Sequence, residues 1–293
     1  MIVDKKYLLL TNFEHIKELK GHSGCQLNLY KEKDTFFLRK DAGSSSYNHR
    51  LKKQCAKQKW FKIDSVKTPK VLRYGYDSNN LFYFDMEFIN GICMSEYMNQ
   101  IKIKEIVDLI GLLFTSLPIK QSVITDKSES VFKEKILSLY KTCDTNNQLI
   151  LKSLNKLKEF NFQNVPLSSC CGDLTLENII LSSSGIYVID LLDSFYNSWM
   201  IDVAKLLQDI DLGWSYRHQE RNYNLNLRLA TAKQALLDNL YAMKNGKQNV
   251  IIIYHILLLN VLRIYPYAKD QTTILFLNNA LESVLNSINE MEA

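Results

Sequence analysis

The stretch 171–190 constrains the fold of this chain more than any other part of the sequence. Two four-residue runs rich in Ile and Val flank the turn sequence Ser-Ser-Ser-Gly at 182–185, and this pattern predicts a β-hairpin. A hairpin brings the start of its first strand beside the end of its second strand. We therefore expect Asn178 to lie close to Asp190, with Asp173 on the loop just before them.

These three polar residues have the spacing that phosphoryl transfer needs. Asp173 and Asn178 stand five positions apart, as do the Asp and Asn of a kinase catalytic loop, and Asp190 follows twelve positions later. One carboxylate would accept the proton of an attacking hydroxyl, while an amide oxygen and a second carboxylate would bind Mg²⁺. In the alternative interpretation, Asp173 is a turn residue and Asp190 only ends a strand. Because the three converge around one hairpin, we favour Asp173 as general base with Asn178 and Asp190 as magnesium ligands.

The same residues carry a resemblance to a known family. Cys-Gly-Asp-Leu-Thr-Leu-Glu-Asn at 171–178 resembles the H-G-D-x-x-x-x-N loop of the aminoglycoside phosphotransferase and choline kinase superfamily. Val-Ile-Asp-Leu-Leu-Asp at 188–193 is similar to its metal-binding segment, and the segment from Asp202 is similar to its D-x-A helix. The resemblance implies an α+β, protein-kinase-like bilobal fold with an antiparallel β-sheet N-lobe and a mainly helical C-lobe. It also implies an ATP-dependent phosphotransferase that acts on an alcohol group.

Length and composition fit two lobes in one chain. The 293 residues are 46% hydrophobic and 23% charged, as in an ordinary globular protein. We expect a β-rich N-lobe on the nucleotide-phosphate side at 1–88, a linker at 89–95, and a helical C-lobe with the catalytic loop at 96–293. The formal net charge of +5 permits anionic ligands such as ATP or GTP but does not argue for nucleic acid as a partner.

The location of the protein is predicted from what the sequence lacks. The N-terminus shows no export signal, and the six cysteines have no metal-binding spacing, which favours reduced thiols in the cytoplasm. The most apolar segment, 250–265, contains a His, an Asn and an Arg. We interpret it as a buried helix, too short and too interrupted to span a membrane.

Two glycines are candidates for binding the nucleotide phosphates. Gly21 and Gly24 lie in a turn between two predicted strands, and kinases cover ATP phosphates with the backbone of such a turn. The turn lacks the full G-x-G-x-x-G pattern, and an ordinary hairpin would look the same.

A third strand, predicted over 35–40, ends in Arg39 and Lys40. The resemblance places a phosphate-pairing basic residue at the position of Arg39. Strand alternation sends the two side chains to opposite faces, so only one of them can enter the site. We expect Arg39, because a guanidinium can bind a phosphate through two parallel hydrogen bonds. An exposed basic strand end is the alternative.

The helix predicted over 42–63 departs from the kinase pattern. Kinases pair the basic residue of the third strand with a glutamate on this helix, but the range contains no Asp or Glu. Either Gln54 or Gln58 substitutes for the acid, or the partner comes from elsewhere in the fold.

The segment after the next strands resembles the family's interlobe linker. There the adenine ring packs between apolar side chains and forms hydrogen bonds to the linker backbone. The resemblance therefore implies nucleotide contacts at three consecutive residues, Glu87, Phe88 and Ile89.

The acceptor is predicted to be a small molecule. Protein kinases carry a long activation segment after the metal-binding aspartate, whereas only eleven residues separate Asp190 from Asp202 here. The resemblance favours a sugar or polyol, with bacterial surface-polysaccharide synthesis as the setting. The segment 209–226 has the composition of a polar substrate pocket, although an exposed loop would look similar.

Two alternatives stay open. A choline- or ethanolamine-type kinase would use aromatic residues to bind its cation, for which Trp199, Trp214 and Tyr216 are available. A pseudokinase would bind a nucleotide without turnover. It is favoured by Cys171 at the position of the family's His and by the missing helix glutamate. We favour the enzyme, because Asp173 and both predicted metal ligands are present.

Overall fold

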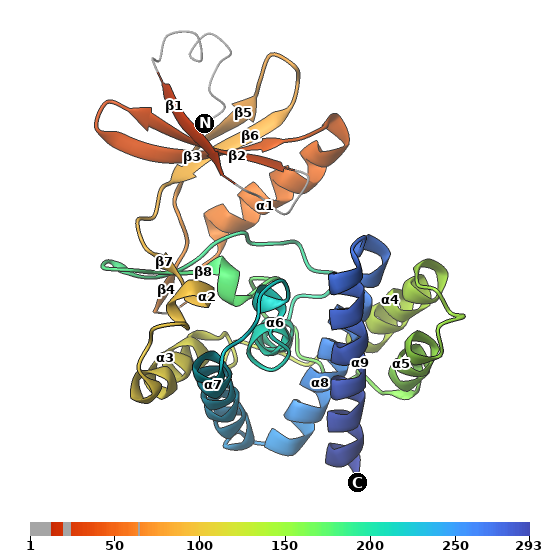
Figure 1. Cartoon of the computed structure of the whole chain (residues 1–293). Coiled ribbons are helices and arrows are strands. Elements are labelled where there is room, and N and C mark those ends of the chain that lie inside the picture. The colour runs from red at the N-terminus through yellow and green to blue at the C-terminus, as the bar shows by residue number, and fades with distance from the viewer. Residues whose placement is uncertain (1–12, 20–24, 64) are drawn as a thin grey trace. The chain divides into compact units, whose positions relative to one another are not determined.

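The computed structural model describes residues 13–19, 25–63 and 65–293 (Figure 1). These residues form two compact units. The first contains the described residues up to Lys62 together with Val66–Ile92 and Ile180–Asp193. The second contains Cys93–Ile179 and Ser194–Ala293, with residues 63 and 65. The predicted boundary at 89–95 contains the division after Ile92, but the hairpin of the predicted catalytic region is grouped with the first unit.

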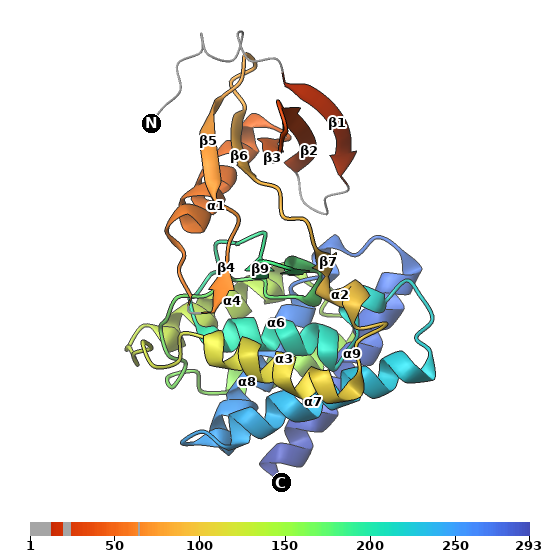
Figure 2. The same ribbon diagram turned by 90° about the vertical axis from the view of Figure 1, so that its left-hand side faces the viewer.

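The first unit is built on a five-stranded antiparallel sheet, visible at the top of Figure 2. Its spatial order is β1-β2-β3-β6-β5, so β1 and β5 are the edges. Its strands are β1 (Glu14–Leu19), β2 (Cys25–Glu32), β3 (Thr35–Ala42), β5 (Val71–Tyr76) and β6 (Phe82–Glu87). The expected antiparallel N-terminal sheet is therefore confirmed.

One helix, α1 (Asn48–Trp60), packs on one face of this sheet. Its buried residues form a core with apolar residues of the strands, namely Ala42, Leu51, Cys55, Phe82, Phe84 and Met86. The helix begins later than the predicted range of 42–63, after the 3₁₀ turn Ser45–Tyr47. Asn48 fixes this start, because its Oδ1 accepts a hydrogen bond of 2.7 Å from the backbone N–H of Phe82 on β6.

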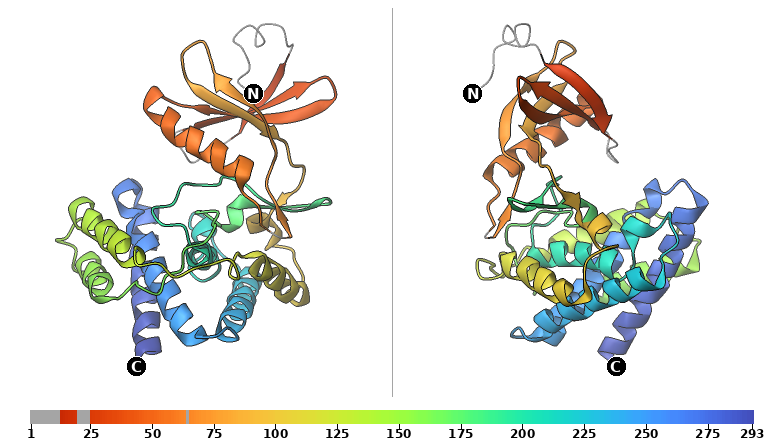
Figure 3. Two further views of the ribbon diagram at one scale, coloured as in Figure 1. Left: turned by 180° about the vertical axis from the view of Figure 1, so that it is seen from behind. Right: turned by 60° about the vertical axis from the view of Figure 1, so that its left-hand side comes forward.

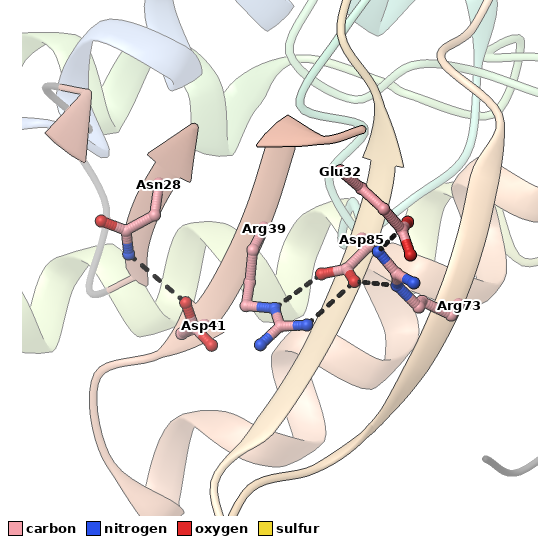
Figure 4. Close-up of polar contacts among 6 residues, drawn as sticks. All are labelled: Asn28, Glu32, Arg39, Asp41, Arg73 and Asp85. Atoms are coloured by element: carbon pink, nitrogen blue, oxygen red, sulfur yellow. Dashed lines mark hydrogen bonds and ion pairs between the residues drawn. The ribbon is translucent and has the colours of Figure 1, made fainter. Parts of the chain in front are cut away.

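The sheet carries a buried ionic network around Asp85 (Figure 4). Asp85 is fully buried, and its two carboxylate oxygens accept hydrogen bonds of 2.7 and 2.9 Å from Arg39. Arg73 donates to the same carboxylate and to Glu32. The Arg39 guanidinium lies 4.2 Å from the centre of the Tyr83 ring. Buried charges need such partners, so the network is a structural element of the unit.

A second, smaller sheet has the order β4-β9-β8-β7. Its strands are β4 (Val66–Lys67), β7 (Ile92–Cys93), β8 (Ile179–Ser182) and β9 (Gly185–Val188). Because β8 and β9 are hydrogen-bonded neighbours joined by two residues, the predicted hairpin is confirmed. Gly185 has a φ of +130°, a conformation that side chains rarely adopt, which explains the glycine in this turn.

The second unit is almost entirely helical (Figure 3). Its helices are α2 (Met94–Tyr97), α3 (Ile103–Ser116), α4 (Ser128–Thr142), α5 (Gln148–Glu159), α6 (Trp199–Ile210), α7 (Tyr223–Tyr241), α8 (Gly246–Leu262) and α9 (Gln271–Glu292). The helix α6 packs against both α7 and α8. Of the twelve residues of α6, only Lys205 is not buried, so this helix is the centre of the unit.

The apolar helix α8 corrects one prediction. The helical segment 246–267 is long and apolar enough to cross a membrane by length and composition, so the expectation of a segment too short to span is wrong. However, 67% of its most apolar window is buried inside the protein. This burial agrees with the predicted role of a core helix.

A buried histidine on α8 predicts acid sensitivity. His255 is fully buried, its ring stacks on Phe160 at 3.6 Å between centroids, and burial lowers its pKa to about 4. Because this value lies below the unfolded value of 6.5, its contribution to stability is present above pH 6.5 and is lost as the pH falls towards 4. We expect this residue to lower the free energy of unfolding by up to about 3 kcal/mol between pH 7 and pH 4.

Urea unfolding at several pH values measures this effect. The matched control is His255→Phe, which keeps an aromatic ring against Phe160 but cannot titrate. The variant should lose less stability on acidification than the wild type. Equal losses in the two proteins would contradict the role of His255.

Candidate active site

The catalytic-loop segment 171–178 lies in the second unit and ends in the 3₁₀ turn Leu176–Asn178. The structure brings Asp173 and Asn178 together. The Asn178 Nδ2 donates hydrogen bonds of 2.9 Å to the main-chain oxygen and 3.1 Å to the Oδ2 of Asp173. The other carboxylate oxygen, Oδ1, lies 3.1 Å from the Nζ of Lys205 on α6. Both oxygens of the predicted base therefore have a defined partner.

The helix α6 positions the loop through three residues on one face. Asp202, Lys205 and Asp209 follow the spacing i, i+3, i+7, which places them in line along the helix. They contact the loop in chain order. The Asp202 carboxylate accepts hydrogen bonds of 2.6 and 2.8 Å from the backbone N–H groups of Cys171 and Gly172, Lys205 pairs with Asp173, and Asp209 accepts one of 2.6 Å from Leu176.

Asp202 lies in the first turn of α6 but does not cap the helix. A carboxylate near a helix start is often its cap, but α6 begins earlier and its cap is Ser198, whose Oγ accepts a hydrogen bond from the Met200 N–H. Asp202 is fully buried and binds backbone groups of the loop instead. The contact at Cys171 uses its backbone N–H, a group that any residue except proline supplies.

Asp209 joins the catalytic loop to the turn after α6. Its Oδ1 accepts hydrogen bonds of 2.7 Å from both the N–H and the Oγ of Ser215, while its Oδ2 accepts from the Leu176 N–H. Burial raises the pKa of Asp209 to about 6, and these hydrogen bonds act in the opposite direction. Through these hydrogen bonds the Asp209 carboxylate links the loop at Leu176 to the turn at Ser215, two segments that are far apart in the sequence.

Asp190 lies in the first unit, directly after the hairpin. It has a φ of +52°, a left-handed conformation that Asp adopts more readily than most residues. Its Oδ1 lies 2.5 Å from the Nζ of Lys40 on β3. The segment that follows is fixed to α1, because Lys57 donates to the main-chain oxygen of Leu192 and Lys53 pairs with Asp193 at 2.8 Å. Asp193 therefore has a structural partner.

Arg39 and Lys40 point to different partners, as strand alternation predicts. Arg39 is bound by Asp85, whereas Lys40 pairs with Asp190. Lys40 shares the strand face of Ala42, whose side chain belongs to the core beneath α1. The arrangement therefore supports Lys40 rather than Arg39 as the basic residue at Asp190. Alternation alone could not decide this, because it does not say which face of the sheet the helix covers.

The predicted metal ligands offer the oxygen atoms that Mg²⁺ prefers. The amide nitrogen of Asn178 is directed to Asp173, which leaves the Oδ1 of Asn178 available. This oxygen accepts no hydrogen bond from the described part of the chain. The Asp190 side chain is 32% exposed and uses one oxygen for Lys40. Each of the two side chains thus has an oxygen of the kind that binds Mg²⁺, and the closeness of Asn178 to Asp190 stays a prediction from the hairpin.

Of the other predicted nucleotide contacts, the structure describes residues 87–89 but not the two glycines. Gly21 and Gly24 lie outside the described residues. The Glu87 N–H donates to the main-chain oxygen of Lys70 at 2.9 Å, so this group is already used. Phe88 packs against another aromatic ring, and Ile89 is 9% exposed. Nucleotide binding by Glu87, Phe88 and Ile89 stays a prediction.

Lys205 is the residue of this site that sequence reasoning missed. Its signal was present as one lysine between two aspartates at helical spacing, on a segment that is otherwise mostly apolar. The pattern D-x-x-K-x-x-x-D places all three charges on one face of a buried helix. Such a charged face within a core requires partners, and the catalytic loop supplies them.

The fold was compared with known proteins. No family model and no curated protein matches the sequence. Among solved structures, a thermostable mutant of aminoglycoside phosphotransferase APH(4)-Ia is similar with a TM-score of 0.68 at 11% identity, over 97% of this chain and 99% of that chain. A ternary complex of such a mutant with ADP and hygromycin B gives 0.64 at 10% identity, over 97% and 98%. An aminoglycoside-3'-phosphotransferase of type VIII gives 0.57 at 15% identity, over 87% and 97%.

These similarities, together with the antiparallel sheet and the helical second unit, establish a protein-kinase-like α+β fold. Within that class, the chain has the fold of the aminoglycoside phosphotransferases, at 11% and 15% sequence identity to two of them.

Proposed function

We propose that this chain is a small-molecule kinase that transfers the γ-phosphate of ATP or GTP to a hydroxyl group of a small acceptor. The observation that carries the proposal is the Asp173 carboxylate, which Asn178 and Lys205 fix at both oxygens. A carboxylate that is oriented but still 23% exposed can accept a proton from an incoming hydroxyl. A protein that only binds nucleotide has no need for such a base.

The residues divide the reaction between them. Asp173 removes the proton of the acceptor hydroxyl as its oxygen attacks the γ-phosphorus, and the nucleoside diphosphate leaves. Lys40, in place of Arg39, pairs with the phosphates of the nucleotide. Asn178 and Asp190 would bind Mg²⁺, which when bound supplies positive charge to the transferring phosphate.

The surroundings of the aromatic residues favour a sugar or polyol over choline. A site for a quaternary ammonium ion needs exposed aromatic faces. Trp199 and Tyr216 are each only 2% exposed, and the guanidinium of Arg217 already covers the Trp214 ring at 3.9 Å. These three residues therefore offer no cation site, whereas a neutral hydroxyl compound does not require one. Bacterial surface-polysaccharide synthesis remains the proposed setting.

One observation favours the pseudokinase alternative. Neither candidate substitute for the missing acid on α1 contacts Lys40: the Gln54 amide is buried without a hydrogen-bond partner among the described residues, and Gln58 donates to the main-chain oxygen of Pro69. Lys40 therefore pairs with Asp190 instead of with α1. A protein that has lost turnover could keep such an arrangement, so binding and turnover must be measured separately.

We place the protein in a reducing compartment such as the cytoplasm. No disulfide is recorded for the six cysteines, all of which lie in the described part of the chain. Disulfides are common in exported proteins and rare in the cytosol, so this state supports the location.

Thermal unfolding with ATP or GTP, with and without Mg²⁺, tests the nucleotide site. A ligand at a hundred times its dissociation constant should add about 2.7 kcal/mol of stability. We expect a Mg²⁺-dependent shift that is lost in Asp190→Ala, because this carboxylate is a proposed metal ligand. Asp126→Ala, at an exposed position, is the control and should keep the shift.

Release of ADP is then measured with sugars, polyols and choline as acceptors. Acceptor-dependent release supports the kinase, and binding without release supports the pseudokinase. If neither nucleotide shifts the unfolding temperature, both interpretations are wrong.

A further inference from the structure

Lys205 is placed where it can act on the proposed base. Its side chain is 14% exposed, and its Nζ lies 3.1 Å from Asp173 Oδ1 and 3.2 Å from Gln208 Oε1. The loop segment 171–178 contains no Lys or Arg of its own. The positive charge beside the Asp173 carboxylate therefore comes from α6.

Lys205 contacts a side chain of the loop, whereas Asp202 and Asp209 on the same helix contact its backbone. Asp202 and Asp209 bind backbone N–H groups and so fix the path of the loop. Lys205 instead binds the side chain of Asp173. Because the buried carboxylates of Asp202 and Asp209 hold the loop at both ends, we expect the loop to keep its path without Lys205. The ammonium group of Lys205 then serves to orient the carboxylate of Asp173.

The geometry leaves room for the substrate. An ionised carboxylate has about four lone-pair positions. Asn178 occupies one on Oδ2 and Lys205 one on Oδ1, so each oxygen of Asp173 keeps a further position for an acceptor hydroxyl. Fixing a carboxylate from both sides in this way directs the remaining lone pairs, which matters because misplacement by about 1 Å can cost a factor of about 10² in rate.

We propose that Lys205 is a positioning residue for phosphoryl transfer, acting through Asp173. This inference rests on the proposed function. In the transfer step the acceptor O–H bond breaks as the O–P bond forms, the proton goes to Asp173, and the nucleoside diphosphate leaves with the electrons of the broken P–O bond. Lys205 holds the carboxylate in the orientation that receives the proton.

A double-mutant cycle between Lys205 and Asp173 tests the proposal. The measured quantity is the rate of ADP release from ATP and MgCl₂, with glucose and glycerol as acceptors and water as the background acceptor. Lys205→Met, which keeps the length of the side chain but removes the charge, should lower kcat by about 10²-fold with little change in the KM for ATP. Lys205→Arg keeps the charge and should recover most of the rate. In the Asp173→Asn background, Lys205→Met should have almost no further effect, because its target is gone.

Lys233→Met is the matched control. Lys233 also forms an ion pair in the second unit, with Asp211 at 2.8 Å, but it does not contact Asp173. This variant should keep the wild-type kcat.

Three results would overturn the assignment of Lys205. These are an unchanged kcat in Lys205→Met, an equal loss in the Asp173→Asn background, or a loss that Lys205→Arg does not recover while thermal unfolding shows a damaged fold. An active wild type with any of these results leaves the proposed function in place. A wild type that binds ATP but releases no ADP overturns the kinase proposal and the role of Lys205 together.

Discussion

Asp173→Asn is expected to lower kcat by about 10² to 10⁴-fold, the usual contribution of a general base. Asparagine keeps the size of the side chain and can still accept from the Asn178 amide, so the loop should keep its path. The fold should be preserved as well, because Asp202 and Asp209 bind the loop through its backbone. The loss should therefore be in turnover and not in the affinity for nucleotide. ADP release and the Mg²⁺-dependent thermal shift measure the two quantities separately.

The control for this prediction is Asp126→Asn, which makes the same chemical change at an exposed position. It should leave both quantities unchanged. A wild-type rate in Asp173→Asn would remove this residue from the role of base. Loss of the thermal shift in the same variant would mean that the carboxylate serves the nucleotide site instead.

Asp85→Ala is expected to lower the free energy of unfolding by about 3–5 kcal/mol, the largest effect on stability that we predict for the first unit. The substitution removes the carboxylate that both Arg39 and Arg73 bind, and it leaves two guanidinium groups without their shared buried partner. Arg39 is only 12% exposed, so water cannot readily replace the lost contact. Urea unfolding measures the change.

The comparison is Lys53→Ala, which removes an ion pair whose two side chains are 53% and 47% exposed. Exposed pairs contribute about 1 kcal/mol or less, so this variant should unfold almost as the wild type does. Similar losses in Asp85→Ala and Lys53→Ala would show that the network around Asp85 is not the stabilising element that its burial indicates.

The parts of the fold that follow from local patterns could be predicted from the sequence. The two runs rich in Ile and Val and the turn sequence at 182–185 specify the hairpin β8–β9, because both its strands and its turn lie within ten residues. The spacing of Asp173 and Asn178 likewise predicts their contact, since the 3₁₀ turn between them is a local structure. Such features depend little on the rest of the chain.

The features that depend on distant segments could not be predicted. Asp202 looks like a helix cap in the sequence, because a carboxylate near a helix start is the local explanation, but its partners lie about thirty residues earlier. The choice between Arg39 and Lys40 also required the position of α1 on the sheet. For Lys205, the charged face of its helix could be recognised in the sequence, but its partner could not, since Asp173 belongs to a different element.

The double attachment of Asp209 has a consequence for changes in the turn after α6. The same carboxylate binds Leu176 of the catalytic-loop segment and Ser215 of that turn. A sequence change that removes Ser215 would therefore act on a residue that also holds the segment carrying Asp173. Exchanges of this turn that keep Ser215 should be the ones that leave the position of Asp173 unchanged.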